Sequence, residues 1–166
     1  KRLNRLIEDF LLFARPAVPN FRKIDLNAML QDHLDRFELQ INGSNIDMRN
    51  NIPQIPCQMN ADPDLLMRAI GNVLKNAVEA TENKGQIKIN VCTMNDQWIL
   101  EIDDQGPGIE EERIGKIFEP FFTTRAKGTG LGLAFVKQVV TAHSGKVIAE
   151  NCKDNGARFI FSLPLN

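Results

Sequence analysis

The feature that most constrains the fold of this chain is a glycine-rich stretch at the start of an amphipathic run. Residues 128–133 read Gly-Thr-Gly-Leu-Gly-Leu, and apolar residues then recur at helical spacing, which predicts a helix over 129–143. Glycine lets the backbone adopt left-handed angles and approach a ligand closely. The first N–H groups of a helix suit a phosphate. The stretch therefore indicates either a phosphate cradle or a plain turn into a helix.

The spacing of these glycines excludes two common nucleotide sites. The chain has no G-x-x-x-x-G-K-[ST] sequence, which excludes a P-loop. It also has no G-x-G-x-x-G after a strand, so neither a dinucleotide site nor a protein-kinase glycine loop fits.

A second candidate element is a carboxylate at the end of a predicted strand. The alternating segment 98–102 is followed by Asp103 and Asp104, and then by Gly106 and Gly108 in a turn that contains proline. A solvated loop aspartate is one interpretation. The other is an acceptor aimed at a ligand donor such as an adenine amino group.

The third element is a helix with two asparagines beside its apolar stripe. Asp62 and Pro63 are a typical N-cap and first helical residue, and the apolar pattern predicts a helix over 63–82. Asn72 and Asn76 are four residues apart and border that stripe. Asparagine is a poor interior helix residue, and amide oxygens suit Mg²⁺ that keeps phosphates and water as its other ligands.

In order, these elements resemble the N box (Asn72 to Ala77), the G1 box (Asp104 to Gly108) and the G2 box (128–133) of bacterial sensor histidine kinases, in their catalytic, ATP-binding domain. The segment 118–122, Phe-Glu-Pro-Phe-Phe, is similar to the F box of that family. Asn-Ala-Val-Glu-Ala at 76–80 and Phe-Phe-Thr-Thr-Arg at 121–125 resemble the nitrogen-regulation-type subgroup.

The resemblance implies a fold, a domain division and a set of ligands. The expected fold class is α+β, a two-layer sandwich in which helices cover one face of a mixed β-sheet, as in gyrase and MutL. Residues 1–19 would be the end of a dimerisation-bundle helix plus a proline-containing linker, and residues 20–166 the ATP-binding domain. The expected cofactors are ATP and Mg²⁺, with ADP as a further ligand.

The expected roles of single residues follow the boxes. Asn76 is the first candidate for Mg²⁺ and Asn72 the second, and both are the candidate catalytic residues. The expected nucleotide contacts are Asn72, Asn76, Asp104, Gly106, Gly108, Lys127, Gly128, Thr129, Gly130, Leu131 and Gly132. Arg125 and Lys127 could neutralise phosphate, although surface cations are more often solvated. An acidic Glu79 speaks against a direct triphosphate contact at its position. Phe118, Phe121 and Phe122 could anchor a lid over 105–127 or form a docking face for the phospho-acceptor helix.

Two functions stay open at this stage. ATPases of the wider superfamily carry glutamate as general base where this chain has Asn72, which cannot take a proton. That favours a protein-histidine kinase over an ATPase or a nucleotide-gated interaction module. The two histidines of the chain, His33 and His143, are not in an acceptor context, and His143 suits a cationic cap at a helix end. The acceptor histidine is therefore expected outside this chain.

Composition sets the remaining expectations. The net charge is −1 without a basic stripe, and no apolar run approaches the ~20 residues of a membrane helix, so neither nucleic acid nor membrane is an expected partner of this segment. The three widely spaced cysteines indicate reduced residues of a cytoplasmic domain, of which the parent could be membrane-anchored. Dimerisation and phospho-acceptor helices and a response regulator are the implied partners.

Further elements are predicted over 2–14 and 26–41 (helices), a short helical piece near 110–117, and strands over 45–52, 56–60, 86–94, 98–103, 146–151 and 157–163.

Overall fold

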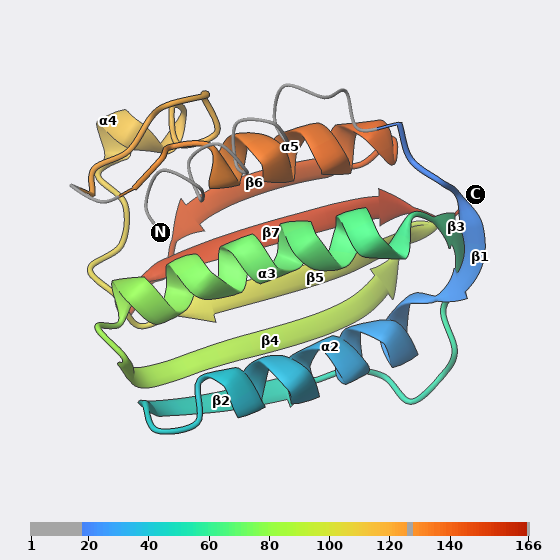
Figure 1. The fold of residues 1–166 in the computed structure, drawn as a ribbon, viewed down its shortest axis with the longest axis horizontal. Helices are drawn as coiled ribbons and strands as arrows, with labels where there is room; N and C mark the ends of the chain where they lie inside the picture. The colour runs from blue at the N-terminus through green and yellow to red at the C-terminus, as the bar shows by residue number, and fades with distance from the viewer. Residues whose placement is uncertain (1–17, 126–127, 166) are drawn as a thin grey trace.

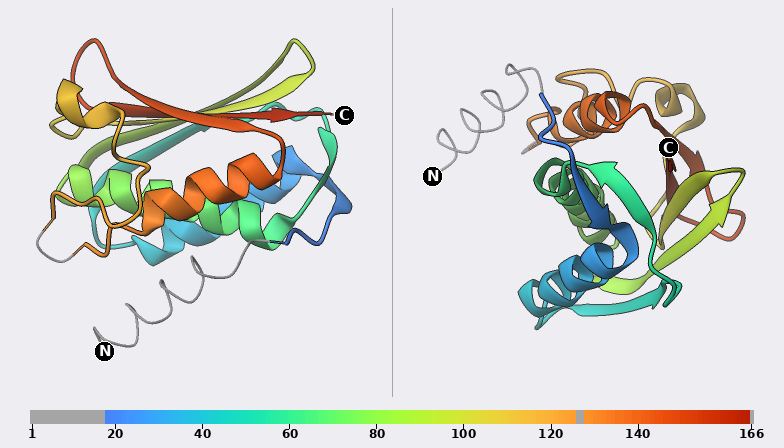
Figure 2. Two further views of the ribbon diagram at one scale, coloured as in Figure 1. Left: turned by 90° about the horizontal axis from the view of Figure 1, so that it is seen from above. Right: turned by 90° about the vertical axis from the view of Figure 1, so that its right-hand side faces the viewer.

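The computed structural model describes residues 18–125 and 128–165, which form two layers (Figures 1 and 2). Three long helices cover one face of a mixed sheet, as the sequence predicts. In the described chain the elements are β1 (Arg22–Asp25), α2 (Leu26–Gln40), β2 (Asn45–Asn51), β3 (Gln58–Ala61), α3 (Pro63–Ala80), β4 (Lys84–Met94), β5 (Gln97–Asp104), α4 (Glu111–Ile114), α5 (Gly132–Ala142), β6 (Lys146–Asn151) and β7 (Ala157–Pro164). The predicted helix over 2–14 lies outside the described residues, and the division at residue 19 stays a prediction.

The main sheet has five strands in the order β2-β4-β5-β7-β6, and a separate pair joins β1 to β3. The β2–β4 pair is parallel, and the other pairs are antiparallel. Both predicted hairpins form. β4 turns into β5 through Asn95 and Asp96, which have φ of 52° and 56°, as a tight turn between twisted strands requires.

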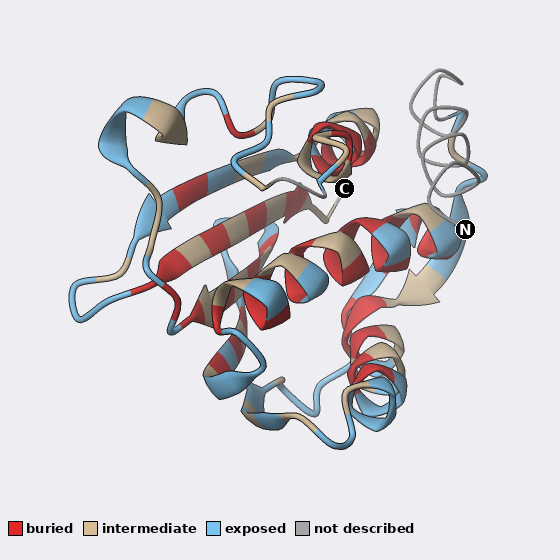
Figure 3. Ribbon diagram, turned by 60° about the vertical axis from the view of Figure 1, so that its left-hand side comes forward, coloured by how far each residue is buried: buried red, intermediate tan, exposed pale blue. Residues whose placement is uncertain are grey.

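The core lies between the helices and the sheet (Figure 3). α3 runs between α2 and α5 (Figure 1), and its apolar stripe is buried from Leu66 to Ala77. Trp98 of β5 is fully buried, and its Nε1–H donates to Asn27 Oδ1 at 2.9 Å. Asn27 Nδ2 donates in turn to the Ile55 carbonyl at 2.8 Å. These bonds satisfy polar groups that would otherwise be costly in the core.

Several elements differ from the sequence-based ones: most bounds shift by one or two residues, and three differences are larger. The strand β1 was not predicted, because its four residues carry no alternation of apolar side chains. The helix α5 begins at Gly132 rather than at residue 129, since Gly130 has φ of +67° and breaks the helical path. The helical piece after the G1 box is one turn, α4. No helix in the described part of the chain combines the length and the apolar character that crossing a membrane requires.

A buried histidine joins the C-terminal end of α5 to the N-terminal end of α3. His143 follows α5, and its Nε2 accepts from the Asp62 backbone N–H at 2.9 Å. Its Nδ1 lies 2.8 Å from the Val139 carbonyl, so the ring is the neutral tautomer that donates from Nδ1. Asp62 in turn caps α3 by accepting from Leu65 N–H at 3.0 Å. The predicted capping role is confirmed, but the predicted positive charge is wrong because Nε2 is an acceptor.

Candidate functional site

The predicted nucleotide residues come together at one end of the molecule. The C-terminal half of α3, the end of β5 and the start of α5 lie at the same side, on the left of Figure 1, beside the connection between β5 and α5. This side is opposite to the one where His143 meets Asp62.

Asp104 is the last residue of β5 and is 5% exposed. Its Oδ1 accepts from Gly106 N–H at 2.8 Å and from Ala157 N–H at 3.2 Å. Burial raises the pKa of this carboxyl above its ordinary value, and the two hydrogen bonds partly oppose that rise. Because both bonds go to Oδ1, the second oxygen is the atom suited to accept from a ligand.

The two glycines of the G1 box stand where another residue type would clash or be strained. A Cβ on Gly106 would lie 2.9 Å from Asp104 Oδ1, and Gly108 has φ of +79°. Asn151 at the end of β6 clamps the same loop: its Oδ1 accepts from Ile109 N–H and its Nδ2 donates to the Ile109 carbonyl, each at 2.7 Å. Sequence reasoning missed Asn151, because nothing near it in the chain points to the G1 box.

The two asparagines of α3 are both half-buried and have different neighbours. Asn72 Nδ2 donates to the Gly132 carbonyl at 3.4 Å, which ties α3 to the first turn of α5. Asn76 Oδ1 accepts from the Arg125 guanidinium at 3.3 Å. Within the described residues no three His, Cys, Asp or Glu side chains gather into a metal-binding group. A Mg²⁺ at this site would depend on amide oxygens and on the phosphates that come with it.

Arg125 is the cation that reaches into the site. Its Nη2 donates to the Asn76 backbone carbonyl at 3.2 Å, and its Nη1 also pairs with the Glu79 carboxylate. The positive charge of Arg125 is one of the smaller influences on the pKa of Asp104, which it lowers. Asn76 Oδ1, the expected metal ligand, thus contacts a positive group already. The amide oxygen is therefore chemically suited to a cation, and Mg²⁺ fits the residues present.

The G2 segment leads into α5, and its glycines pack closely against residues in and just after the F-box segment. Gly130 packs on the backbone of Phe121: its carbonyl accepts from Phe121 N–H at 3.0 Å, and a Cβ on it would lie 2.4 Å from the Phe121 carbonyl carbon. A Cβ on Gly128 would lie 2.3 Å from Thr123 Oγ1. The start of α5 has no side-chain cap, so its first N–H groups suit an incoming anion. Leu131 is its buried N-cap residue, and Thr129 is half-buried.

The three phenylalanines of the F-box segment differ in environment. Phe118 and Phe122 are half-buried and pack on the core, and Phe118 meets the Phe159 ring edge-on at 6.4 Å between centroids. Phe121 is 61% exposed. Two of the three therefore act as anchors in the described structure, while the lid and docking roles stay predictions.

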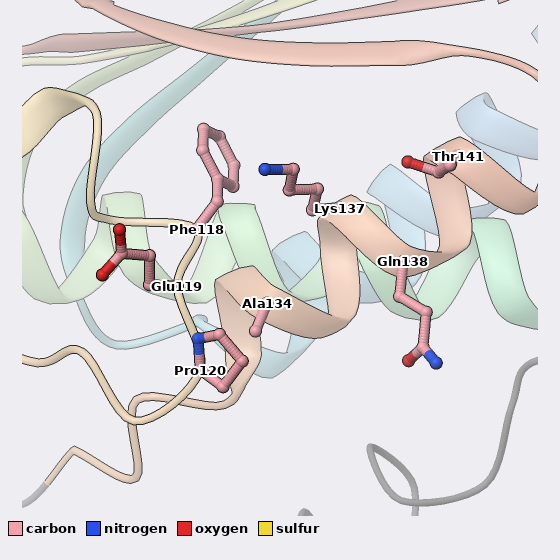
Figure 4. A pocket seen from close by; sticks show the side chains of 7 residues that line it. All are labelled: Phe118, Glu119, Pro120, Ala134, Lys137, Gln138 and Thr141. Carbon is pink, nitrogen blue, oxygen red and sulfur yellow. The ribbon is translucent and has the colours of Figure 1, made fainter.

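A groove lies between the F-box segment and α5 (Figure 4). Its lining residues are Phe118, Glu119, Pro120, Ala134, Lys137, Gln138 and Thr141. This lining includes no described residue of the predicted nucleotide site.

Of the expected nucleotide contacts, Lys127 lies outside the described residues. Asp104, Asn76, Asn72 and the residues 128–132 share one end of the molecule. Their individual roles toward nucleotide and metal remain predictions.

Comparison with known proteins identifies the family of the chain. Residues 61–166 match the family described as histidine kinase-, DNA gyrase B-, and HSP90-like ATPase. The chain is similar to the signal transduction histidine-protein kinase AtoS of Escherichia coli K12, with 34% identity over 165 residues, 99% of this chain and 27% of that protein. It is 35% identical over 166 residues to the sensor histidine kinase ZraS of Klebsiella oxytoca, across 99% of this chain and 36% of that protein.

Solved structures of histidine kinases are similar to this chain in fold. The catalytic domain of histidine kinase ThkA superposes with a TM-score of 0.81 at 35% identity, covering 88% of this chain and 96% of that one. ThkA in complex with the response regulator protein TrrA gives a TM-score of 0.85 at 32% identity, covering 99% of this chain and 48% of that one. The chain thus spans roughly a quarter to a third of the curated kinases it matches.

Proposed function

Because the chain belongs to the histidine kinase-, DNA gyrase B- and HSP90-like ATPase family, we propose that it binds Mg-ATP and presents the γ-phosphoryl group to a histidine outside this chain. One observation carries the proposal: a buried carboxylate, an amide-bearing helix and an uncapped helix start converge at one end of the molecule. Phosphoryl transfer requires mainly that phosphates be positioned and their charge neutralised.

Each part of the site has a proposed role toward Mg-ATP, which follows from its position. Asp104 accepts from the adenine amino group through its second oxygen, and Asn76 holds Mg²⁺, with Asn72 as a further contact. The residues 128–132 and the first N–H groups of α5 hold the phosphates. Mg²⁺ would neutralise charge on the transferred group when it is bound.

Two features of the chain favour transfer to an outside acceptor, the first over hydrolysis and the second over transfer to the chain itself. The amide of Asn72 cannot remove a proton from water. The two histidines are also unsuited to accept phosphate. His143 is 3% exposed with both ring nitrogens engaged, and His33 Nε2 lies buried beside Gly71. The acceptor therefore comes from a dimerisation and phospho-acceptor helix, and a response regulator then takes the phosphoryl group, in a cytoplasmic signalling protein.

A labelling experiment tests this proposal. Incubated with γ-labelled ATP and Mg²⁺, the chain alone should gain no acid-labile phosphate and should release phosphate very slowly. Adding a fragment with an acceptor helix should place label on the histidine of that fragment. Weak docking would make this labelling slow, because alignment of donor and acceptor is much of the catalysis. Fast phosphate release would favour an ATPase, and label on His33 or His143 would contradict the external acceptor.

A further inference from the structure

The Arg125 side chain stands at the atom that the proposed function assigns to Mg²⁺. Its guanidinium donates to Asn76 Oδ1 at 3.3 Å and to the Asn76 carbonyl at 3.2 Å, and Glu79 supplies the opposite charge. Asn76 and Glu79 lie almost one turn apart on α3, so both face the segment that carries Arg125.

A guanidinium and a Mg²⁺ ion cannot share this oxygen at low cost. Two cations drawn to one amide oxygen would be only a few ångströms apart, and they would repel each other strongly in a partly buried site. Nucleotide that arrives with its metal must therefore move Arg125 away from Asn76. Nucleotide without metal has no need to displace it from that atom.

The ion pair with Glu79 sets how strongly Arg125 is held at Asn76. The carboxylate is the charged partner of the guanidinium and lies on the rigid helix, whereas Arg125 belongs to the connection before α5. The side chains are 39% and 51% exposed for Arg125 and Glu79, so water screens the pair and its strength is modest. A modest hold suits an interaction that has to break at each nucleotide binding event.

We propose that Glu79 is a positioning residue that keeps Arg125 on Asn76 in the nucleotide-free domain, so that Mg²⁺ and Arg125 exchange at this amide when nucleotide binds. This inference rests on the proposed function, and it assigns to Glu79 a role in setting the affinity for metal-loaded nucleotide. The Arg125 carbonyl accepts from Gly128 N–H at 3.1 Å, so the released side chain stays within reach of the residues proposed to hold the phosphates.

Titration calorimetry with ADP tests the exchange, in Mg²⁺ and separately in EDTA. We expect Glu79→Gln to bind ADP about two- to fivefold more tightly in Mg²⁺, the effect of losing a partly exposed ion pair. In EDTA its affinity should equal that of the wild type. In an Arg125→Ala background, Glu79→Gln should change nothing in either condition, because the pair is already gone. Glu82→Gln, a charge-matched control just beyond α3, should behave as wild type.

Simple repulsion between Glu79 and the phosphates gives a different pattern. It would make Glu79→Gln tighten binding at least as much in EDTA, where the nucleotide carries more negative charge, and the gain would persist without Arg125. Either result, or an unchanged affinity in Mg²⁺, would overturn the exchange while leaving the proposed function intact. Failure of the wild type to bind ADP in Mg²⁺ would instead overturn the proposed function, and the exchange with it.

Discussion

Replacing Asp104 by asparagine should separate nucleotide recognition from folding. In the wild type, Oδ1 accepts from the N–H groups of Gly106 and Ala157, and the second oxygen is proposed to accept from adenine. Asparagine keeps one oxygen for the two backbone donors. Its NH₂ group, however, would then face the amino group of adenine, and two donors cannot pair. The variant thus loses a hydrogen bond to a charged acceptor, which is worth about 1.5–3 kcal/mol. The corresponding loss of affinity is about 10- to 150-fold.

The stability of this variant should not fall at neutral pH. Burial raises the pKa of Asp104, so the folded state binds a proton more readily than the unfolded chain. The contribution of Asp104 to stability therefore declines as pH rises from the unfolded value through the folded one. Asparagine has no charge to desolvate, so Asp104→Asn should melt at the wild-type temperature or higher at pH 7.

Calorimetric titration with ADP and thermal melting of the same samples measure both effects. Asp104→Ala is the matched control, because it leaves the Gly106 and Ala157 N–H groups without their acceptor and should cost about 1–3 kcal/mol of stability for each unsatisfied group. Wild-type affinity in Asp104→Asn would refute the assignment of adenine to this carboxylate. A large drop in its melting temperature would refute the hydrogen-bond argument.

Three further predictions concern other parts of the site and core. Asn76→Ala should reduce the ratio of ADP affinities with and without Mg²⁺, measured by titration; an unchanged ratio would remove Asn76 as the metal ligand. Gly130→Ala should destabilise the domain by more than about 1–3 kcal/mol in a denaturant titration, because alanine is strained at a positive φ and its Cβ would also overlap the Phe121 backbone. Gly132→Ala is its control, since the nearest atom to an added Cβ lies 4.0 Å away, and an equal loss there would contradict the strain argument. Burial, and then Arg36 and Lys75, lowers the pKa of His33, so stability should fall as pH drops below about 6.5. His33→Gln should flatten that part of a melting-temperature profile, and an unaltered pH dependence would exclude His33 as its source.

The long elements of this fold could be predicted because their signals are local. α3 carries an N-cap, a proline and an unbroken apolar stripe, and the β4–β5 hairpin carries its turn residues between alternating segments. The strand β1 could not be predicted, since it exists by pairing with β3, more than thirty residues further along the chain. Likewise the first turn of α5 depends on Gly130, whose left-handed angle fits the backbone of Phe121.

The same contrast between local signals and contacts of distant residues applies to the candidate site. Asn72, Asn76 and Asp104 could be singled out as candidates because an unusual residue type stands at a defined place on a helix or strand. Asn151 was missed because it acts on Ile109, forty-two residues away. The charge of His143 was misjudged for a related reason: a cation at a helix end is the expected local arrangement, but the Asp62 N–H from the other helix makes Nε2 an acceptor.

The bond between Asp62 and His143 also closes a ring of chain around most of the candidate site. It joins residues 81 apart in sequence, and the segment it encloses contains both asparagines, Asp104 and the whole G2 stretch. The family match begins at Ala61, one residue before this closure. A chain boundary placed anywhere between Asp62 and His143 would therefore open this ring and separate parts of the candidate site.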